Sequence, residues 1–259
     1  MSSHTPIRVV LVDDVPELRL LVRLTLEEDP GIEVVGEASN GREGVDVARE
    51  TDPDVVLLDL SMPDMDGLEA IPLIRAAAPR ARLVVLSGHE AGRVSLEALD
   101  QGATRYINKA AGLDQIPRTV HEVAKLEPPF THESFGVVRT MWEAFLDGQI
   151  DRMCENATVD AQWRPYVAPG RELRSRDEAR EFILDLIKQG KVIDPRAYGV
   201  EPRGPGLVVL GTLEMRGPEG FSETEVFWAF CFSGDMVALA AGFDRREEAI
   251  AMVAEGCGG

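Results

Sequence analysis

Four short strand-type segments in the first half of the chain each end on a polar residue, and no other feature constrains the fold as strongly. The segments cover residues 7–12, 55–58, 83–86 and 105–108, and they are followed by Asp13-Asp14, Asp59, Ser87 and Lys109. Near-continuous apolar runs are typical of parallel strands that are buried on both faces. In such a sheet the functional crevice lies outside the carboxyl ends of the strands. Three carboxylates, a hydroxyl and an ammonium gathered there suit a divalent cation and a phosphoryl group.

Amphipathic helical patterns alternate with these strands. In residues 15–28, Leu18, Val22 and Leu26 fall on one helical face, and Asp29-Pro30-Gly31 ends the helix. A further strand pattern covers residues 32–38, and further helical patterns follow Asn40-Gly41 and cover residues 68–78, 94–99 and 113–126. Five successive β-α units predict an α/β domain over residues 1–126, with a doubly wound, five-stranded parallel sheet.

The second half of the chain has a different order of patterns. Residues 127–133 contain Pro128-Pro129, which stops the preceding helix and stiffens the segment, so we expect a linker here. The helical patterns cover residues 134–148, 150–156, 177–189 and 245–254, and the strand patterns cover residues 158–165, 197–203, 207–216, 224–233 and 236–244. Helices first and antiparallel strands afterwards predict an α+β domain over residues 134–259.

The charge of the chain argues against nucleic-acid binding. The net charge is −18, and both halves contribute, because residues 1–127 hold 13 Lys and Arg against 23 Asp and Glu and the remainder holds 14 against 22. A protein binds a duplex by placing Lys and Arg on its phosphates. Neither half offers a basic face for this purpose, so we expect no DNA partner.

Other features of the composition predict a cytoplasmic protein. The chain contains no run of about 18 apolar residues, so no membrane span is expected. Its first six residues lack the basic and apolar segments of a secretory signal. Three cysteines, Cys154, Cys231 and Cys257, show no metal-ligand spacing, and their odd number argues against a disulfide framework. We expect Cys154 and Cys231 to pack as small apolar side chains.

The motifs of the first half resemble a response-regulator receiver domain, which has a flavodoxin-like fold. The resemblance covers about residues 6–126. It rests on Asp13-Asp14, on Asp59 within Leu-Leu-Asp-Leu-Ser-Met-Pro-Asp-Met-Asp-Gly, on Ser87 within Val-Leu-Ser-Gly-His, and on Lys109 within Tyr-Ile-Asn-Lys. The run Val-Val-Gly-Glu-Ala-Ser-Asn-Gly at residues 34–41 is closest to receivers that carry a helix-turn-helix output.

The resemblance implies a role for each of these residues. It makes Asp59 the phosphoacceptor, whose carboxylate attacks a phosphohistidine on a sensor histidine kinase or a phosphotransfer protein. Asp13, Asp14, Asp59 and the backbone carbonyl of Ser61 would hold Mg²⁺, a hard cation that prefers oxygen ligands. Lys109 and Ser87 would contact the phosphoryl oxygens, and Tyr106 would swing inward as Ser87 moves.

Simpler interpretations exist for each residue taken singly. Asp13-Asp14 can be a solvated turn, Asp59 a helix-capping acid and Lys109 a surface charge, and a tyrosine in a strand is as often a packing residue as a switch. Agreement at four separate strand ends favours the functional interpretation. One departure from the family concerns Ala110, which stands where the family usually has a proline that aims the lysine.

The second half resembles the nuclear-transport-factor-2-like superfamily, which includes SnoaL-like polyketide cyclases. The resemblance rests on the order of elements and on the phrases Val-Arg-Thr-Met-Trp-Glu-Ala-Phe-Leu-Asp-Gly, Ser-Arg-Asp-Glu-Ala-Arg-Glu-Phe and Gly-Phe-Asp-Arg-Arg-Glu-Glu-Ala. It implies a curved sheet wrapped on helices around a conical pocket. Members of the superfamily use this pocket for ligands, for catalysis or for neither.

Candidate residues of such a pocket are aromatic. Trp163, Tyr166, Tyr198 and Trp228, with Phe227 and Phe230, can line a pocket or pack as core or as a dimer face. Asp160 and Asp194 are the candidate acid or base groups, because the only histidine of this half, His132, lies in the expected linker. Arg164, Arg171 and Arg174 can bind an anion or form an exposed charge cluster.

Three hypotheses for function follow. The first is a two-component response regulator, phosphorylated on Asp59, whose second domain is not a conventional enzyme and binds a protein, a second copy of this chain or a small apolar ligand. The second is a receiver-gated enzyme of the cyclase or isomerase type, which requires a buried Asp160 or Asp194 that faces an open pocket. The third is a transcription factor in direct contact with DNA, which the charge opposes.

Overall fold

The computed structural model describes residues 5–126 and 133–257 of the chain. The chain divides into two compact units, unit 1 at residues 1–130 and unit 2 at residues 131–259. The expected linker at 127–133 falls on residues 127–132, outside the described residues, and Glu133 begins the first helix of unit 2. None of the helices in the described ranges is long and apolar enough to cross a bilayer.

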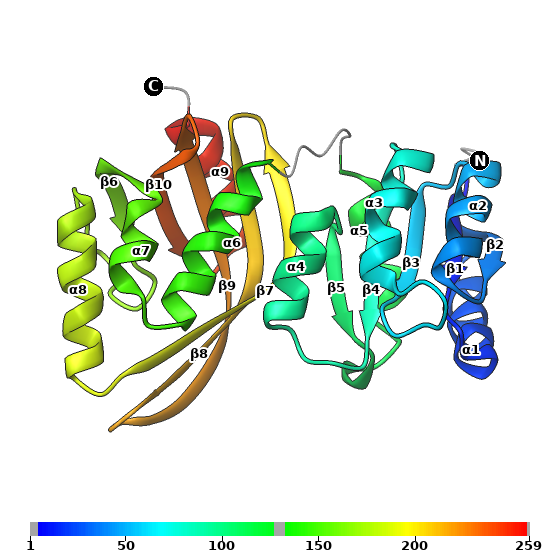
Figure 1. Cartoon of the computed structure of the whole chain (residues 1–259), viewed down its shortest axis with the longest axis horizontal. Coiled ribbons are helices and arrows are strands. Elements are labelled where there is room, and N and C mark those ends of the chain that lie inside the picture. Colours follow the sequence, from blue (N-terminus) through cyan, green and yellow to red (C-terminus); the bar gives the residue numbers. More distant parts are fainter. Residues whose placement is uncertain (1–4, 127–132, 258–259) are drawn as a thin grey trace. The chain divides into compact units, whose positions relative to one another are not determined.

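Unit 1 has the predicted α/β architecture. Its strands are β1 (Ile7–Val12), β2 (Ile32–Ala38), β3 (Val55–Asp59), β4 (Arg82–Ser87) and β5 (Arg105–Asn108), and its helices are α1 (Pro16–Glu27), α2 (Gly41–Thr51), α3 (Gly67–Ala77), α4 (Arg93–Gln101), the 3₁₀ turn η1 (Lys109–Ala111) and α5 (Ile116–Ala124). The strands pair in parallel in the order β2-β1-β3-β4-β5. Figure 1 shows the helices of this unit on both faces of the sheet.

Helices cover the sheet of unit 1 because its strands are apolar on both faces. All five residues of β3 are buried. Val22 and Leu26 of α1 pack in one cluster with Leu11 and Leu57 of the sheet, and Val120 and Val123 of α5 join the same cluster. With the inner strands held in parallel register, Val12 of β1 lies opposite Leu58 of β3, so Asp13 and Asp59 follow at the same edge.

Unit 2 combines helices with a largely antiparallel sheet. Its elements are α6 (Glu133–Leu146), α7 (Ile150–Glu155), β6 (Ala157–Arg164), α8 (Arg176–Lys188), β7 (Val192–Arg203), β8 (Gly206–Gly217), β9 (Gly220–Ser233), β10 (Met236–Phe243) and α9 (Arg246–Gly256). The strands follow the order β7-β8-β9-β10-β6, antiparallel except for the β10–β6 pair. The predicted order of helices and antiparallel strands is observed, and Figure 1 shows β8 and β9 bending along their length.

Two strands of unit 2 begin four or five residues earlier than the sequence predicted. β7 begins at Val192 instead of residue 197, and β9 begins at Gly220 instead of residue 224. Pro195 has no backbone N–H to donate to the neighbouring strand. The antiparallel register with β8 nevertheless continues past it, and Pro195 lies opposite Leu213. Tertiary pairing with a long neighbour therefore extends both strands beyond their local sequence signals.

The two faces of the sheet in unit 2 carry different helices. Successive residues of a strand point to opposite faces. On β9, Phe227 and Ala229 pack in one cluster with Ala249 and Val253 of α9. The intervening Trp228 lies edge-on to Trp142 of α6, with ring centroids 5.0 Å apart. Helix α9 therefore covers one face of β9, and α6 covers the other.

Candidate functional site

The sequence-predicted acidic residues of unit 1 form one cluster. Asp13 follows β1, and Asp59 is the last residue of β3. One carboxylate oxygen of each of Asp13, Asp14 and Asp59 lies within 4.8 Å of the others. Asp13 is 5% exposed and Asp59 is 3% exposed, so both carboxylates are largely withdrawn from water. A cluster of oxygen ligands of this kind fits Mg²⁺.

Lys109 bridges two of these carboxylates. Its Nζ lies 2.8 Å from Asp13 Oδ2 and 2.8 Å from Asp59 Oδ1. The residue enters the cluster from the end of β5, where η1 begins. The Asn108 side chain accepts a hydrogen bond from the backbone N–H of Ala110 at 2.8 Å. A proline at position 110 has no such N–H, so in this chain the Asn108 cap orders the turn that follows the lysine.

Burial and ion pairing have opposite effects on the pKa values of the residues in this cluster. Burial raises the pKa of Asp59 above its usual range; the Lys109 ammonium partly offsets this increase, and the Asp13 charge adds to it. Burial alone would lower the pKa of Lys109, but hydrogen bonds to Asp13 and Asp59 raise it above its ordinary value. The Lys109 ammonium therefore holds Asp59 beside a second carboxylate.

Ser87 and Tyr106 lie next to each other beside this cluster. Ser87 ends β4 and is fully buried, and its Oγ accepts a hydrogen bond from the His89 backbone N–H at 3.2 Å. Tyr106 is 3% exposed, and its hydroxyl donates to the His89 backbone oxygen at 2.9 Å. Burial raises the pKa of Tyr106, and a hydrogen bond with Ser87 opposes this increase. Tyr106 thus occupies an inward position, and its predicted movement stays a prediction.

The loop after Asp59 packs tightly against the strand end. A Cβ atom on Gly67, at the start of α3, would lie 2.2 Å from the Asp59 backbone oxygen. The backbone N–H of Ser61 donates to the Asp59 carboxylate, which opposes the increase in the pKa of Asp59 that burial causes. Asp66 caps α3 by accepting from the Glu69 N–H at 2.8 Å. Glycine at position 67 lets α3 begin directly against Asp59.

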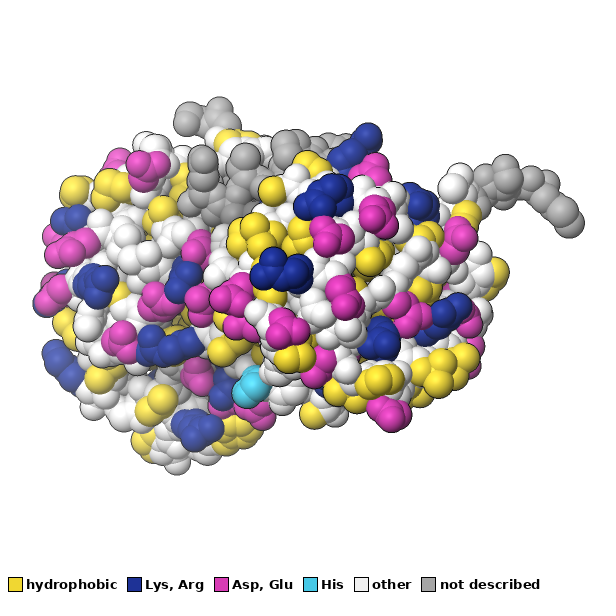
Figure 2. All heavy atoms as spheres, turned by 45° about the vertical axis from the view of Figure 1, so that its right-hand side comes forward, with side chains coloured by type: hydrophobic (Ala, Val, Ile, Leu, Met, Phe, Trp, Pro, Cys, Tyr) yellow, Lys and Arg dark blue, Asp and Glu magenta, His cyan; other side chains and the backbone are white. Residues whose placement is uncertain are grey.

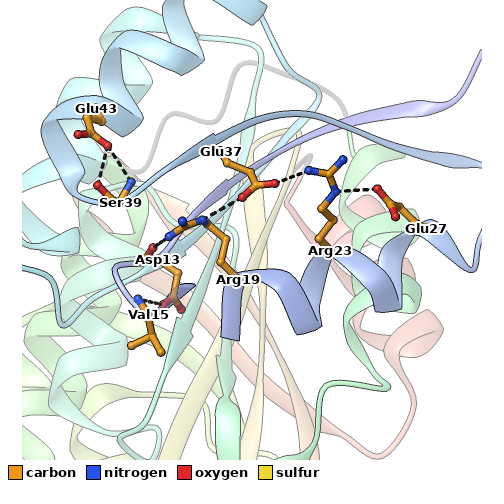
Figure 3. Close-up of polar contacts among 8 residues, drawn as sticks. All are labelled: Asp13, Val15, Arg19, Arg23, Glu27, Glu37, Ser39 and Glu43. Carbon is orange, nitrogen blue, oxygen red and sulfur yellow. Dashed lines mark hydrogen bonds and ion pairs between the residues drawn. The ribbon is translucent and has the colours of Figure 1, made fainter. Parts of the chain in front are cut away.

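Arg19 also contacts the cluster and pairs with Glu37, and the sequence analysis assigned neither residue a role. Arg19 Nη1 donates to the backbone oxygen of Asp13 at 2.6 Å, and its Nε donates to Glu37 at 2.9 Å (Figure 3). Arg23 also pairs with Glu37, at 2.7 Å. Burial raises the pKa of Glu37, but its hydrogen bonds with Arg23 and Arg19 lower it overall. In the sequence, the available sign of these contacts was that Arg19 and Arg23 lie one helical turn apart. Only the fold shows that β2, which carries Glu37, lies beside α1.

Comparison with known proteins matches the first unit to receivers. Residues 9–121 match the family model for the response regulator receiver domain. The nitrate/nitrite response regulator protein NarL of Escherichia coli (strain K12) is 40% identical over 126 residues, which are 48% of this chain and 57% of NarL. The related protein NarP of the same strain is 32% identical over 166 residues, which are 61% of this chain and 77% of NarP.

The chain belongs to the response regulators. Among solved structures, the response regulator domain of Thermotoga maritima CheB is 30% identical, with a TM-score of 0.45 over 48% of this chain and all of that domain. Because residues 9–121 match the receiver family model, the response regulator described here has an N-terminal receiver, as the sequence predicted. It spans a little over half the length of NarL.

Unit 2 of this response regulator contains an apolar cavity of about 160 Å³. Three of the four predicted pocket residues, Trp163, Tyr166 and Trp228, line it, and so does Phe230. The prediction was wrong for Tyr198, which packs in the cluster around α9 and donates to Glu225. Phe227 packs in the same cluster, because strand alternation sends it to the face opposite Trp228.

The candidate acid and base groups lie outside this cavity. Asp160 is exposed, and Asp194 pairs with Arg196 at 3.2 Å. Neither carboxylate is among the described residues that line the cavity. The enzyme hypothesis required a buried Asp160 or Asp194 that faces an open pocket, and neither residue meets this condition. The candidate anion-binding arginines also have other contacts: Arg164 and Arg174 both pair with Glu172, and the Arg171 guanidinium lies 4.7 Å from the centre of the Phe182 ring.

The cysteine prediction was right for Cys154 and wrong for Cys231. Cys154 is a buried free thiol, and burial raises its pKa. Cys231 of β9 forms a disulfide with Cys257, with Cα atoms 5.2 Å apart. The two cysteines are 26 positions apart in the sequence, which gave no pairing signal, because the contact depends on α9 folding back over β9. An odd number of cysteines therefore did not exclude one bridge.

Proposed function

We propose that this chain is a two-component response regulator in which Asp59 accepts a phosphoryl group from a sensor histidine kinase or a phosphotransfer protein. The receiver would occupy residues 1–126, with a linker at 127–133 and an output domain at 134–259. The observation that carries the proposal is the Lys109 ammonium, which lies 2.8 Å from both of the buried carboxylates, Asp13 and Asp59. Phosphoryl transfer depends mainly on positioning and charge neutralisation, and this cluster supplies both.

In the proposed reaction an Asp59 carboxylate oxygen attacks the phosphorus of a phosphohistidine. The new O–P bond forms as the P–N bond breaks, and the imidazole leaves with the electron pair. Asp13, Asp14, Asp59 and the Ser61 backbone carbonyl would hold Mg²⁺, which neutralises phosphoryl charge when it is bound. Lys109 would exchange its contact with Asp59 for a phosphoryl oxygen, and the Ser87 hydroxyl would donate to another.

Transfer of the phosphoryl group to Asp59 would change the contacts of Tyr106. Its hydroxyl donates to the His89 backbone oxygen, and Ser87 accepts from the His89 N–H, so one short segment contacts both side chains. Movement of Ser87 toward a phosphoryl oxygen would change the contacts of this segment. This is a local charge event that biases an element with two arrangements.

We propose that the second domain is SnoaL-like, with the nuclear-transport-factor-2-like fold, and that it does not bind DNA. The order of its elements and its aromatic cavity support the fold. Its acidic composition supports the absence of a DNA partner, and Figure 2 shows acidic and basic side chains interspersed over one face of the molecule. Exposed Val192 and Phe221 flank Arg216 across the ends of β7, β8 and β9, which supports a role in self-association, in the form of a homodimer.

The acceptor assignment is tested by labelling with acetyl phosphate. We expect Asp59→Asn to abolish the mass increase of one phosphoryl group, because an amide oxygen is a poor nucleophile. Asp64→Asn, in the same loop and exposed, is the matched control and should label normally. Undiminished labelling of Asp59→Asn would refute the assignment. Size-exclusion runs with and without beryllofluoride then test coupling to the output, and an unchanged profile counts against regulated self-association.

A further inference from the structure

Both polar groups of the Asp13 backbone are held by other elements of unit 1. The Asp13 N–H donates to the Ala38 backbone oxygen at 3.2 Å. The Asp13 backbone oxygen accepts from Arg19 Nη1 at 2.6 Å. The side chain is held as well, because Oδ1 accepts from the Val15 N–H at 2.9 Å and Oδ2 lies 2.8 Å from Lys109 Nζ. Arg19 is therefore the side chain that fixes the peptide group following Asp13.

The Arg19 guanidinium is itself fixed at two points. Its Nη1 donates to the Asp13 backbone oxygen, and its Nε donates to Glu37 Oε2 at 2.9 Å (Figure 3). The other oxygen of Glu37 accepts from Arg23 Nη1 at 2.7 Å, and Arg23 Nε donates to Glu27. The exposed fraction of the side chain rises along this row, from 18% for Arg19 to 30% for Glu37 and 45% for Arg23. Water therefore weakens the Arg19–Glu37 pair less than the pairs further out.

A β-bulge in β2 turns the Glu37 side chain toward α1. The parallel register shifts there, because Val9 lies opposite Val34 but Val10 lies opposite Gly36. Regular alternation would send a residue three positions after Val34 to the opposite face of the sheet. The extra residue instead puts Glu37 on the same face as Val34, which packs in the cluster with α1. Bulges beside functional sites re-aim side chains in this way.

The carboxylates near Arg19 make its choice of partner important. The Asp14 side chain is half-buried, and it has no hydrogen-bond or ion-pair partner among the described residues. A guanidinium that lacked Glu37 would be drawn to the carboxylates of the cluster, because opposite charges attract more strongly where water is partly excluded. There it would compete with a divalent cation for the same oxygens. The hydrogen bond from Arg19 Nε to Glu37 prevents this exchange of partners.

We propose that Glu37 is a positioning residue of the phosphoacceptor site, which fixes Arg19 so that Arg19 holds the Asp13 backbone and stays off the cation ligands. The inference rests on the proposed function, because it takes the carboxylate cluster as an Mg²⁺ site. Among the described residues, the Glu37 carboxylate pairs only with Arg19 and Arg23. Its effect on the site therefore passes through Arg19.

The test is a double-mutant cycle in the full-length protein, with Mg²⁺ affinity measured by calorimetry. We expect Glu37→Ala to weaken Mg²⁺ binding about threefold to tenfold, as the loss of one charged hydrogen bond allows. In the Arg19→Ala background the same change should alter the affinity by less than about twofold, because no guanidinium remains to be positioned. Glu37→Gln keeps an acceptor oxygen for Arg19, so it should retain at least about half of the wild-type affinity.

An NMR signal reports the positioning in metal-free protein. The Asp13 carbonyl and the Asp14 N–H belong to one peptide group, so the ¹⁵N shift of the Asp14 amide responds to the hydrogen bond from Arg19. Arg19→Ala and Glu37→Ala should move this signal in the same direction. A purely structural role of Glu37 elsewhere in β2 would not produce the same shift as the loss of Arg19.

Glu43→Gln is the matched control, because Glu43 is an exposed carboxylate that senses the Arg19 charge but accepts hydrogen bonds from Ser39 (Figure 3). It should leave both the Mg²⁺ affinity and the Asp14 signal unchanged.

Two results would overturn the proposal and leave the proposed function standing. One is an equal loss of Mg²⁺ affinity from Glu37→Ala in the wild-type and Arg19→Ala backgrounds, because it would show an effect of charge alone. The other is an Asp14 signal that does not move in Glu37→Ala. The absence of Mg²⁺ binding by the wild-type protein would overturn this proposal together with the metal assignment, so the two failures are distinguishable.

Discussion

Replacing Lys109 with methionine should destabilise unit 1 at neutral and alkaline pH. Methionine has a similar length, so the packing is retained and the change removes mainly the ammonium. The loss leaves Asp13 and Asp59 buried next to each other without the cation that lies 2.8 Å from both. Breaking a fully buried ion pair in this way costs about 3–5 kcal/mol. Because Lys109 is 18% exposed and water can partly replace it, we expect about 2–4 kcal/mol.

The effect should depend on pH with a defined sign. The folded-state pKa of Asp59 is raised, so its ionised form costs stability above that pKa, and the cost disappears as the pH falls through it. The pKa of Lys109 is also raised, so its contribution persists to a pH above its ordinary value. Removing Lys109 raises the pKa of Asp59 further. The difference between variant and wild type is therefore fully present at pH 8, persists into alkaline pH and shrinks in acid.

The assay is urea unfolding with a separate probe for each unit. Hydrogen exchange of the β1 and β3 amides reports unit 1, and tryptophan fluorescence reports unit 2, because Trp142, Trp163 and Trp228 all lie there. We expect only the first probe to shift. Added Mg²⁺ should stabilise the variant more than the wild type, because the cation replaces the lost charge. Lys125→Met, an exposed lysine of the same unit, is the control. Equal stability of Lys109→Met and wild type at pH 8 would refute the reasoning.

Three further predictions concern the surroundings of the two sites. Arg19→Ala removes the hydrogen bond to the Asp13 backbone oxygen and should weaken Mg²⁺ binding about tenfold, as measured by calorimetry. Arg23 pairs with Glu37 and Glu27 instead, so Arg23→Ala should leave Mg²⁺ binding unchanged. Equal losses of affinity in the two variants would contradict a positioning role for Arg19. Cys257→Ser should lower the stability of unit 2 by about 3–4 kcal/mol in fluorescence-detected unfolding, and the idea fails if the difference persists after reduction. Gly67→Ala places a Cβ 2.2 Å from the Asp59 backbone oxygen and should lower the stability of unit 1 by about 1–3 kcal/mol, as measured by hydrogen exchange. Gly88→Ala, with open space around its Cβ, should leave that stability nearly unchanged. Similar stabilities of the two variants would contradict the close approach at Gly67.

The sequence alone predicted the receiver because its signals are local and repeated. Near-continuous apolar strands, amphipathic helices and a polar residue after each strand are visible without tertiary information. Once the strands are parallel, Asp13, Asp59 and Lys109 must meet at one edge, and the structure places them together. The cation bridge itself needed side-chain positions, as did the Arg19 contact with the Asp13 backbone.

Unit 2 was less predictable because its features depend on contacts between distant segments. Trp228 and Phe227 are adjacent in the sequence, but strand alternation sends the first to the cavity and the second to α9. Tyr198 was mistaken for a pocket residue for the same reason. The Cys231–Cys257 bridge required α9 to return over β9.

The amino-acid order by itself determined the parallel sheet of unit 1 and the edge where its polar residues gather, because a buried parallel strand is encoded within about six residues. Only the tertiary structure decided which aromatic side chains enclose the cavity, where a disulfide closes and which donor, Trp163 Nε1, has no partner among the described residues. These features depend on side chains from many elements meeting in space, and no local pattern of residues specifies such a meeting.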